Sequence, residues 1–251
     1  MPAPPAPDSP SSAGALARRT AIAAGSLRAW VAPRCALCGT ARGDPLCAGC
    51  AADFLSANER RCRVCALRLG SDGDLCGRCL RQPPVFDATH ALADYAAPID
   101  ALISGLKFGH RLEIARTLGL LLGRVIDERT PSAACLVPIP LAFERQRERG
   151  FNQALEIARV AARTCRRRLL AHALLRVRHR PPQEALALTA RRTNLRGAFA
   201  VDAASEATLA GRCVVLIDDV MTSGSTLDEA ARVLKRAGAA PVICAVVART
   251  P

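Results

Sequence analysis

An unbroken apolar run that ends in two adjacent aspartates is the feature of this sequence that most restricts its fold. The run from Cys213 to Ile217 is continuously apolar, as expected for a strand that is buried on both faces of a parallel sheet. Asp218 and Asp219 follow it, and the chain then becomes small and polar before a helical pattern begins. A strand, an acidic pair and a short loop into a helix indicate an α/β domain with a ligand crevice at the carboxyl end of the strand.

The rest of the chain beyond residue 84 alternates between strand-like and helix-like segments, which supports a parallel sheet. Apolar residues recur at helical spacing in several segments, and short extended runs separate them. We expect helices over residues 99–108, 112–127 and 152–165, and one from Leu227 that Gly238 ends. We expect strands over residues 85–95, 135–140, 197–201, 213–217 and 242–247.

The loop after the acidic pair has the composition of a phosphate-binding turn. Its backbone N–H groups and hydroxyls can be aimed at a phosphate, and the following helix adds the positive end of its dipole. Carboxylates repel phosphate, so Asp218 and Asp219 suit ribose hydroxyls, either directly or through Mg²⁺. The loop consists of Thr222, Ser223, Gly224, Ser225 and Thr226, and its glycine lets the backbone approach a ligand closely.

Other nucleotide sites do not fit this stretch, although a structural role for the acids stays open. The Gly-Lys-Ser/Thr of a nucleoside-triphosphate loop is missing, and no G-x-G-x-x-G motif follows the strand. Adjacent aspartates after a strand also serve as caps and turn formers. The 13-residue order from Val214 to Thr226, taken as a whole, favours a phosphate and ribose site.

Eight of the twelve cysteines form four Cys-x-x-Cys pairs. Each pair can turn two thiolates toward one cation, and two pairs supply the four ligands of a tetrahedral structural zinc. The repeated spacing predicts two sequential zinc ribbons, and a cross-braced pairing of the same ligands is the alternative. The first group is Cys35, Cys38, Cys47 and Cys50, and the second is Cys62, Cys65, Cys76 and Cys79.

Thiols in such pairs can also serve iron–sulfur, redox or disulfide chemistry. Iron–sulfur clusters also take thiolates, whereas a redox pair usually stands alone beside a βαβ unit. Disulfides need an oxidising compartment, and no convincing export signal is present because Arg28 interrupts the Ala-rich stretch after Arg18 and Arg19. No apolar run is long enough for a membrane helix. We therefore predict a cytoplasmic protein with no membrane span. The other four cysteines lie in apolar contexts and are expected to be buried: Cys135, Cys165, Cys213 and Cys244.

The acidic stretch resembles the signature of type I phosphoribosyltransferases, and further motifs resemble the ComF family, the competence protein F-like proteins. The matching stretches are Leu106–Phe108, Val137–Leu141 and Arg145–Gln153, and Gln183, Arg191, Arg192, Asn194 and Phe199 follow in family-like order. The resemblance covers about residues 33–251. It implies a double zinc ribbon over 33–82 and a phosphoribosyltransferase-like domain over 83–251. Residues 1–32 lie outside it, and the abundance of Pro, Ala and Ser in Met1 to Ala13 predicts a disordered tail with a short helix after it.

This resemblance implies a ligand and roles for individual residues. The ligand is 5-phosphoribosyl-1-diphosphate (PRPP) with Mg²⁺, held at the acidic pair and the loop that follows. Arg147, Arg149 and Lys107 would lie by the diphosphate, where arginine can make forked hydrogen bonds. The arginines could instead be solvated charges, and Asn152 and Gln153 ordinary helix-start residues. Pro138, Ile139 and Pro140 would form the pyrophosphate loop.

Two functions follow from the resemblance. The first is a binding protein of DNA uptake (natural competence) that holds single-stranded DNA, works with other competence proteins and keeps the PRPP pocket. The alternative is an active phosphoribosyltransferase with an unidentified acceptor. The net charge of +13 would attract nucleic acid, although its bias toward arginine also fits a GC-rich coding sequence. Aromatic residues make up only 3% of the chain, so we expect DNA binding to be mostly electrostatic and to weaken with salt.

Overall fold

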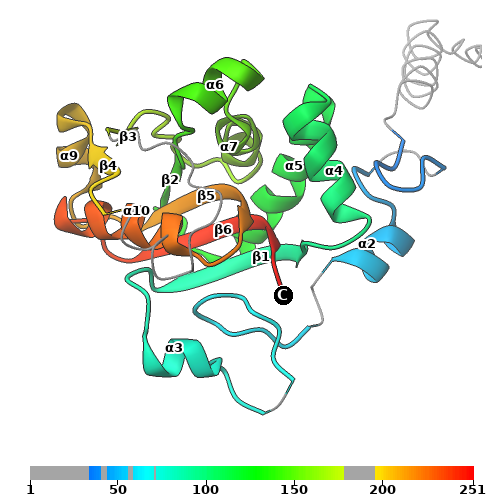
Figure 1. Ribbon diagram of the computed structural model, residues 1–251, viewed down its shortest axis with the longest axis horizontal. Coiled ribbons are helices and arrows are strands. Elements are labelled where there is room, and N and C mark those ends of the chain that lie inside the picture. The colour runs from blue at the N-terminus through cyan, green and yellow to red at the C-terminus, as the bar shows by residue number, and fades with distance from the viewer. Residues whose placement is uncertain (1–33, 41–43, 56–58, 71, 178–195) are drawn as a thin grey trace, which may run out of the picture. The chain divides into compact units, whose positions relative to one another are not determined.

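A computed structural model of the chain describes residues 34–40, 44–55, 59–70, 72–177 and 196–251 (Figure 1). The chain divides into two compact units, residues 1–47 and 48–251, and the helices and strands below belong to the second. None of the helices described is long and apolar enough to cross a membrane. Four residues of the family-like order lie outside the described residues, namely Gln183, Arg191, Arg192 and Asn194.

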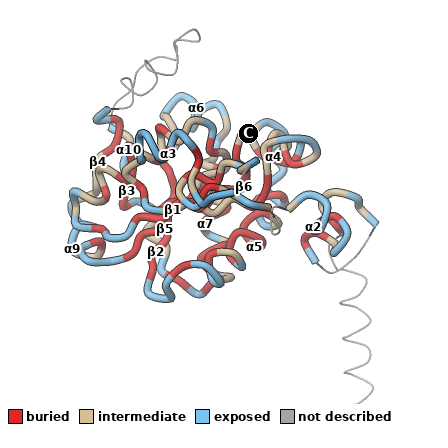
Figure 2. The backbone as a smooth tube through the Cα atoms, turned by 90° about the horizontal axis from the view of Figure 1, so that it is seen from below, coloured by how far each residue is buried: buried red, intermediate tan, exposed pale blue. Residues whose placement is uncertain are grey.

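A four-stranded parallel sheet forms the core of the second unit. Its strands follow the order β1-β6-β5-β2, which places the two longest strands in the middle. The sheet lies among buried segments of the chain (Figure 2). This arrangement confirms the predicted parallel-sheet α/β fold. The strands are β1 (Ala88–Asp94), β2 (Cys135–Pro138), β5 (Val214–Met221) and β6 (Val242–Arg249).

Helices pack against both faces of this sheet, which explains why β5 is apolar at successive positions. Val214 and Leu216 belong to one apolar cluster with Leu227 of α10. Because side chains alternate along a strand, Val215 points to the opposite face, where α5 and α7 pack against the sheet. The helices involved are α5 (Leu112–Arg129), α7 (Gln153–Thr164) and α10 (Ser225–Arg236), and α4 (Ile99–Phe108) packs against α5.

Helices α5 and α7 approach each other closely at two glycines. A Cβ atom on Gly119 would lie 2.6 Å from Cβ of Val160, and one on Gly123 would lie 2.7 Å from Cβ of Thr164. Both distances are too short for any side chain, so only glycine permits this helix spacing. The close packing holds α5 and α7 against the face of the sheet opposite α10.

Strand β5 continues past its predicted end at Ile217. Asp218 lies in register with Val246 of β6, and Met221 lies in register with Arg249. The strand extends to Met221 because β6 offers partners for three more residues of β5, namely Asp218, Val220 and Met221. The acidic pair therefore belongs to the last part of a strand rather than to the loop, which fixes its backbone.

Several short elements were not predicted from the sequence. Strand β3 pairs antiparallel with β4, which falls within the predicted extended segment 197–201. The short elements carry too few residues for a periodic apolar pattern to emerge. The elements that were not predicted are α2 (Ala48–Phe54), α3 (Gly77–Arg81), α6 (Phe143–Arg149), β3 (Leu174–Arg176) and α9 (Ala203–Leu209), whereas β4 (Phe199–Val201) was predicted.

Candidate functional site

The acidic pair stands half-buried at the carboxyl end of β5. Backbone N–H groups hold both carboxylates: that of Asp219 donates to Oδ1 of Asp218 over 2.9 Å, and that of Val220 donates to Oδ1 of Asp219 over 2.8 Å. The second oxygen of Asp219 pairs with Nζ of Lys107 over 2.8 Å. Lys107 lies in the last turn of α4, so packing between a helix and the sheet brings these predicted site residues together.

The carboxylates of Asp218 and Asp219 repel each other, and the ammonium group of Lys107 offsets part of that repulsion. Burial and the neighbouring Asp219 carboxylate raise the pKa of Asp218 well above its ordinary value, and Lys107 opposes the rise. A pair of crowded carboxylates gains from any further cation that approaches it. Oxygen donors of this kind are those that Mg²⁺ prefers, so the residues present fit a magnesium ion with a polyanionic ligand.

The loop after β5 turns sharply into α10. Gly224 has a φ of 77°, in the left-handed region that favours glycine. The Oγ atoms of Ser223 and Ser225 lie 2.9 Å apart, and the N–H of Ser225 donates to Oγ of Ser223 over 3.3 Å. Thr222 is exposed, and Thr226 lies in the first turn of the 12-residue helix. The positive end of α10 therefore adjoins the small hydroxyl side chains of the loop.

The predicted pyrophosphate loop follows β2, the neighbour of β5. Pro138 is the last residue of β2 and lies in register with Ile217. The N–H of Ile139 donates to the Ile217 carbonyl over 2.9 Å, and Nδ2 of Asn152 donates to the Ile139 carbonyl over 2.9 Å. This bond fixes the segment that runs through Pro140 toward α6, directly beside the acidic end of β5.

Asn152 and Gln153 mark the start of α7. Oδ1 of Asn152 accepts from the N–H groups of Ala154 and Leu155, as an N-cap does. Gln153 is 2% exposed, and its Nε2 has no hydrogen-bond partner within the described parts of the chain. Asn152 therefore combines helix capping with support of the loop after β2.

The two predicted arginines of α6 have different surroundings. Arg149 is half-buried and stacks over the ring of Phe108 at 5.0 Å from its centroid. Burial and the nearby Arg145 lower the pKa of Arg149, and Asp219 opposes this shift. Arg147 is exposed and lies over Phe143 at 5.9 Å. Arg149 thus stands within the field of Asp219, whereas Arg147 contacts a ring of its own helix.

A further arginine, which the sequence did not reveal, lies within the electrostatic field of Asp218. Arg176 of β3 lies over the ring of Phe199 on β4 at 5.4 Å. Burial and Arg145 lower the pKa of Arg176, and Asp218 opposes the shift. The short strand gave no signal in the sequence, because three residues do not reveal which side chain faces inward.

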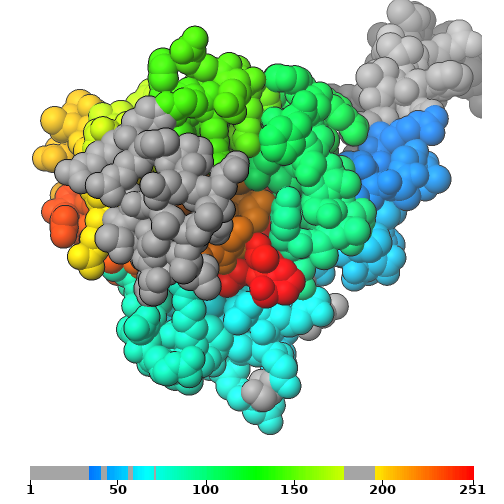
Figure 3. All heavy atoms as spheres, viewed as in Figure 1, coloured from blue at the N-terminus to red at the C-terminus, as the bar shows by residue number. Residues whose placement is uncertain are grey.

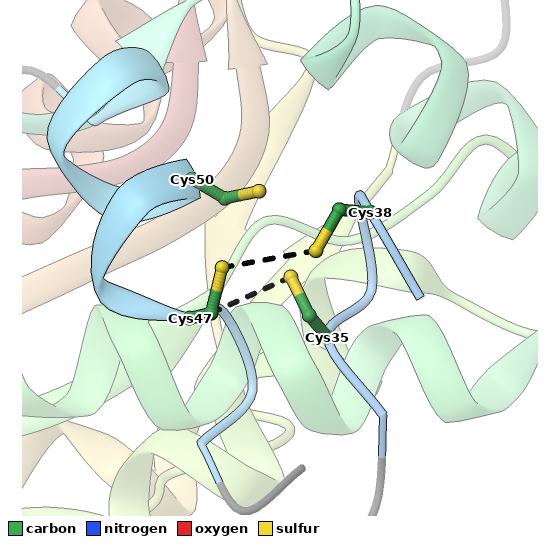
Figure 4. A group of neighbouring side chains, drawn as sticks. All are labelled: Cys35, Cys38, Cys47 and Cys50. Carbon is green, nitrogen blue, oxygen red and sulfur yellow. Dashed lines mark hydrogen bonds between the residues drawn. The ribbon is translucent and has the colours of Figure 1, made fainter. Parts of the chain in front are cut away.

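The cysteines form the two sequential groups, each with its four Sγ atoms within 4.8 Å of one another, which excludes the cross-braced pairing. In the first group the Sγ atoms of Cys38 and Cys47 are 3.7 Å apart (Figure 4). In the second group, Cys65 and Cys76 are 3.6 Å apart and all four thiols are buried. All twelve cysteines are free of disulfides, and the four outside these groups are buried as predicted.

The second group has the electrostatics of a cation site. Burial alone would raise the pKa of Cys62, yet N–H donors from Cys65, Cys76 and Val64 lower it to about 7. Burial and the neighbouring thiol of Cys65 raise the pKa of Cys79. Four thiols this close ionise together only when a cation balances their charge, and Zn²⁺ is the cation that four thiolates suit.

The second zinc ribbon is anchored to the sheet and touches the loop after β5. Asp94 at the end of β1 forms ion pairs with Arg61 over 2.8 Å and with Arg68 over 2.7 Å. The buried Arg249, at the end of β6, donates from Nε to the Cys65 carbonyl over 3.0 Å. A narrow cleft between ribbon and loop is lined by Cys65, Cys79, Phe86, Ser223, Gly224 and Ser225.

Family models match both the segment that carries the cysteine groups and the segment that carries the acidic pair. A model described as a phosphoribosyl transferase domain matches residues 149–251, and one described as a double zinc ribbon domain matches residues 27–80. The two four-cysteine groups therefore belong to a double zinc ribbon with two structural zinc ions. The fold and these matches define a class of protein in which a double zinc ribbon precedes a phosphoribosyltransferase domain.

Relatives identify the family within this class. The chain is 37% identical to the DNA utilization protein YhgH of Escherichia coli K12 over 194 residues, which cover 75% of this chain and 84% of that protein. It is 34% identical to Competence protein F of Haemophilus influenzae over 200 residues, 77% of this chain and 85% of that protein. Competence protein ComFC of Bacillus subtilis is 35% identical over 105 residues, 42% of this chain and 40% of that protein. The chain belongs to the ComF family of DNA utilization and competence proteins.

Proposed function

We propose that this protein binds PRPP with Mg²⁺ at the end of β5 and handles single-stranded DNA during DNA uptake. The observation that carries the first part is the half-buried acidic pair, balanced by Lys107, beside a hydroxyl-rich loop that leads into α10. The family names of its relatives, DNA utilization and competence proteins, support the second part.

Each part of the pocket suits one part of PRPP. The carboxylates of Asp218 and Asp219 would bind the ribose hydroxyls and a Mg²⁺ ion. Backbone N–H groups from Ser223 to Thr226, with the positive end of α10, would bind the 5′-phosphate. When bound, Mg²⁺ supplies positive charge to the diphosphate.

The opposite wall of the pocket suits the diphosphate itself. The segment Pro138 to Pro140 would bring backbone groups to it. Arg149 and Lys107 would add positive charge, and arginine can bind two phosphate oxygens at once. Arg176, which also stands in the field of the acidic pair, is a further candidate for this role.

An active phosphoribosyltransferase is the second candidate. The observation that favours it is the positive surround of the acidic pair, because Arg149 and Arg176 could stabilise a departing diphosphate. Release of pyrophosphate from PRPP in the presence of nucleobases or amines would reveal it. A protein that binds PRPP without such release is a binding protein.

Calorimetric titration of PRPP with Mg²⁺ into zinc-replete protein tests the pocket. We expect binding by the wild type and none by the Asp218→Asn/Asp219→Asn variant, because the ribose and metal ligands are removed. Asp53→Asn, an exposed position on α2, is the matched control and should bind as the wild type does. A folded wild-type protein that does not bind PRPP would refute the first part of the proposal.

A further inference from the structure

Helix α6 lies on the surface and packs no side chain into the protein core. It contains no buried residue, and its first side chain, Phe143, is 66% exposed. The helix is pale blue and tan along its length, and it stands out from the visible face of the molecule (Figures 2 and 3). A short helix with no buried side chain gains little from packing, so its exposed aromatic ring calls for another explanation.

A second exposed ring lies close to this helix. Phe108, at the end of α4, is 69% exposed, and the guanidinium of Arg149 from α6 covers it at 5.0 Å. Phe151 and His110 make an edge-to-face contact at 6.1 Å between centroids beside the same segments. Three of the six phenylalanines of an aromatic-poor chain therefore lie on two adjoining segments, residues 108–110 and 143–151.

Arginines are interleaved with these rings. Helix α6 carries Arg145, Arg147 and Arg149, of which the first two are exposed. Arg147 lies over Phe143 at 5.9 Å, so a guanidinium accompanies this exposed ring as Arg149 accompanies Phe108. Two glutamates of α6 reduce the positive charge of the helix without reversing it. We call Phe108, Phe143 and Arg147 the Phe–Arg surface.

We propose that the Phe–Arg surface binds single-stranded DNA, an inference that rests on the DNA part of the proposed function. Unpaired bases stack on exposed aromatic rings, and phosphates pair with arginines between them. Duplex DNA keeps its bases stacked inside the helix and offers the two rings no partner. The Arg-rich charge of the chain supplies the attraction, and the rings supply the preference for unpaired strands.

The surface also lies next to the predicted PRPP pocket. Phe108 directly follows Lys107, whose Nζ pairs with the carboxylate of Asp219. Arg149 lies over the Phe108 ring and is also close enough to Asp219 for that carboxylate to affect its pKa. A strand on this surface would thus run along the rim of the pocket. The variants that test DNA binding should therefore leave Lys107 and Arg149 in place.

Fluorescence anisotropy of a dye-labelled oligothymidine tests the inference. The proteins to compare are the wild type, the variant Phe108→Ala/Phe143→Ala and the control Phe54→Ala, whose ring is 38% exposed on α2. We expect the double variant to bind about 100-fold more weakly, at about tenfold for each ring. The control should keep its affinity, and zinc content and melting temperature should match among the three proteins.

Two further readouts separate stacking from charge. The wild type should bind a duplex of the same length more weakly, and the two Phe→Ala changes should leave that duplex binding unchanged. Arg147→Gln should reduce the slope of log affinity against log salt by about 0.7, as expected when one phosphate contact to a single strand is lost. The double Phe variant should keep the wild-type slope.

The outcomes distinguish this inference from the function on which it rests. Weaker binding by the double variant alone supports the Phe–Arg surface. Equal binding by the double variant and the wild type overturns this surface and leaves a DNA-binding function intact. A wild-type protein that does not bind the oligothymidine overturns both.

Discussion

The guanidinium of Arg249 donates from Nε to the carbonyl oxygen of Cys65 over 3.0 Å. Its Nη1 donates to the Met221 carbonyl over 3.3 Å, so one buried side chain joins a zinc-binding knuckle to the last residue of β5. The loop predicted to bind phosphate begins at the next residue. Arg249 therefore holds both the second zinc ribbon and this loop in place, and its replacement should perturb both.

Replacement of Arg249 by methionine tests that support. Arg249→Met fills most of the volume but leaves the Cys65 carbonyl buried without its donor, which should lower the free energy of unfolding by about 2 kcal/mol. Urea unfolding of the zinc-replete protein measures the change. Arg236→Met, at an exposed position near the end of α10, should change it by less than about 0.5 kcal/mol. Equal stability of the two variants would contradict a structural role for Arg249.

Loss of the second zinc ion should weaken PRPP binding more than loss of the first. Cys62→Ser removes a buried ligand of the group that lines the cleft beside Ser223 and Ser225. Cys38→Ser removes an exposed ligand of the first group and is the matched control. Elemental analysis should show one zinc ion lost from each variant, and calorimetry should show weaker PRPP binding by Cys62→Ser alone. Similar losses of affinity in both variants would contradict this coupling.

Asp218→Asn should stabilise the folded protein at neutral pH. Because burial and Asp219 raise the pKa of Asp218 in the folded state, the folded protein binds more protons there than the unfolded chain does. Stability therefore falls as pH rises from the ordinary Asp pKa through the raised one, and the cost persists above it. The neutral amide avoids this cost, by about 1 kcal/mol at pH 7.

Thermal unfolding across pH 3 to 8 checks this prediction. The advantage of Asp218→Asn should shrink on acidification and vanish below the ordinary Asp pKa of about 3.9. The exposed Asp53→Asn control should follow the wild type throughout. An advantage that does not change with pH would assign the effect to packing rather than to charge.

The close contact of α5 with α7 predicts a steric penalty at Gly119. A methyl group there would lie 2.6 Å from Cβ of Val160 and 2.8 Å from the Ile157 carbonyl oxygen, so Gly119→Ala should destabilise the fold by about 1–3 kcal/mol. Gly49→Ala on α2 is the control, because no atom lies within 4 Å of its added methyl group. The control should be neutral or slightly stabilising, since alanine favours helices more than glycine does. Comparable melting temperatures for both variants would disprove the close approach.

The sequence allowed the sheet, the long helices and the zinc groups to be predicted, because each leaves a local pattern. The buried strand from Cys213, the apolar spacing of α10 and the four Cys-x-x-Cys pairs can all be recognised within short windows. Helix α6 left no such pattern, since none of its residues is buried and no apolar stripe marks it. Strand β3 was missed because its partner, β4, lies more than twenty residues away in the sequence.

The surroundings of individual charges could not be predicted in the same way. No sequence pattern distinguishes Arg249 from the many other arginines of the chain. The fold nevertheless buries it between Cys65 and Met221, which lie far apart along the chain. Arg176 likewise comes within the electrostatic field of Asp218 through tertiary structure, where β3 pairs with β4. Lys107 and Arg149 were assigned to the pocket from family motifs, and their contacts with Asp219 and Phe108 depend on tertiary structure alone.

The position of Arg149 has a thermodynamic consequence for the two proposed ligands. Its guanidinium lies over Phe108 and within the electrostatic field of Asp219. A bound diphosphate would attract this guanidinium, and a DNA base stacked on Phe108 would contact it, so both ligands act on the same side chain. Binding free energies linked in this way are reciprocal. Whatever factor PRPP imposes on the affinity for single-stranded DNA, the strand must impose on the affinity for PRPP, so either titration would report the coupling.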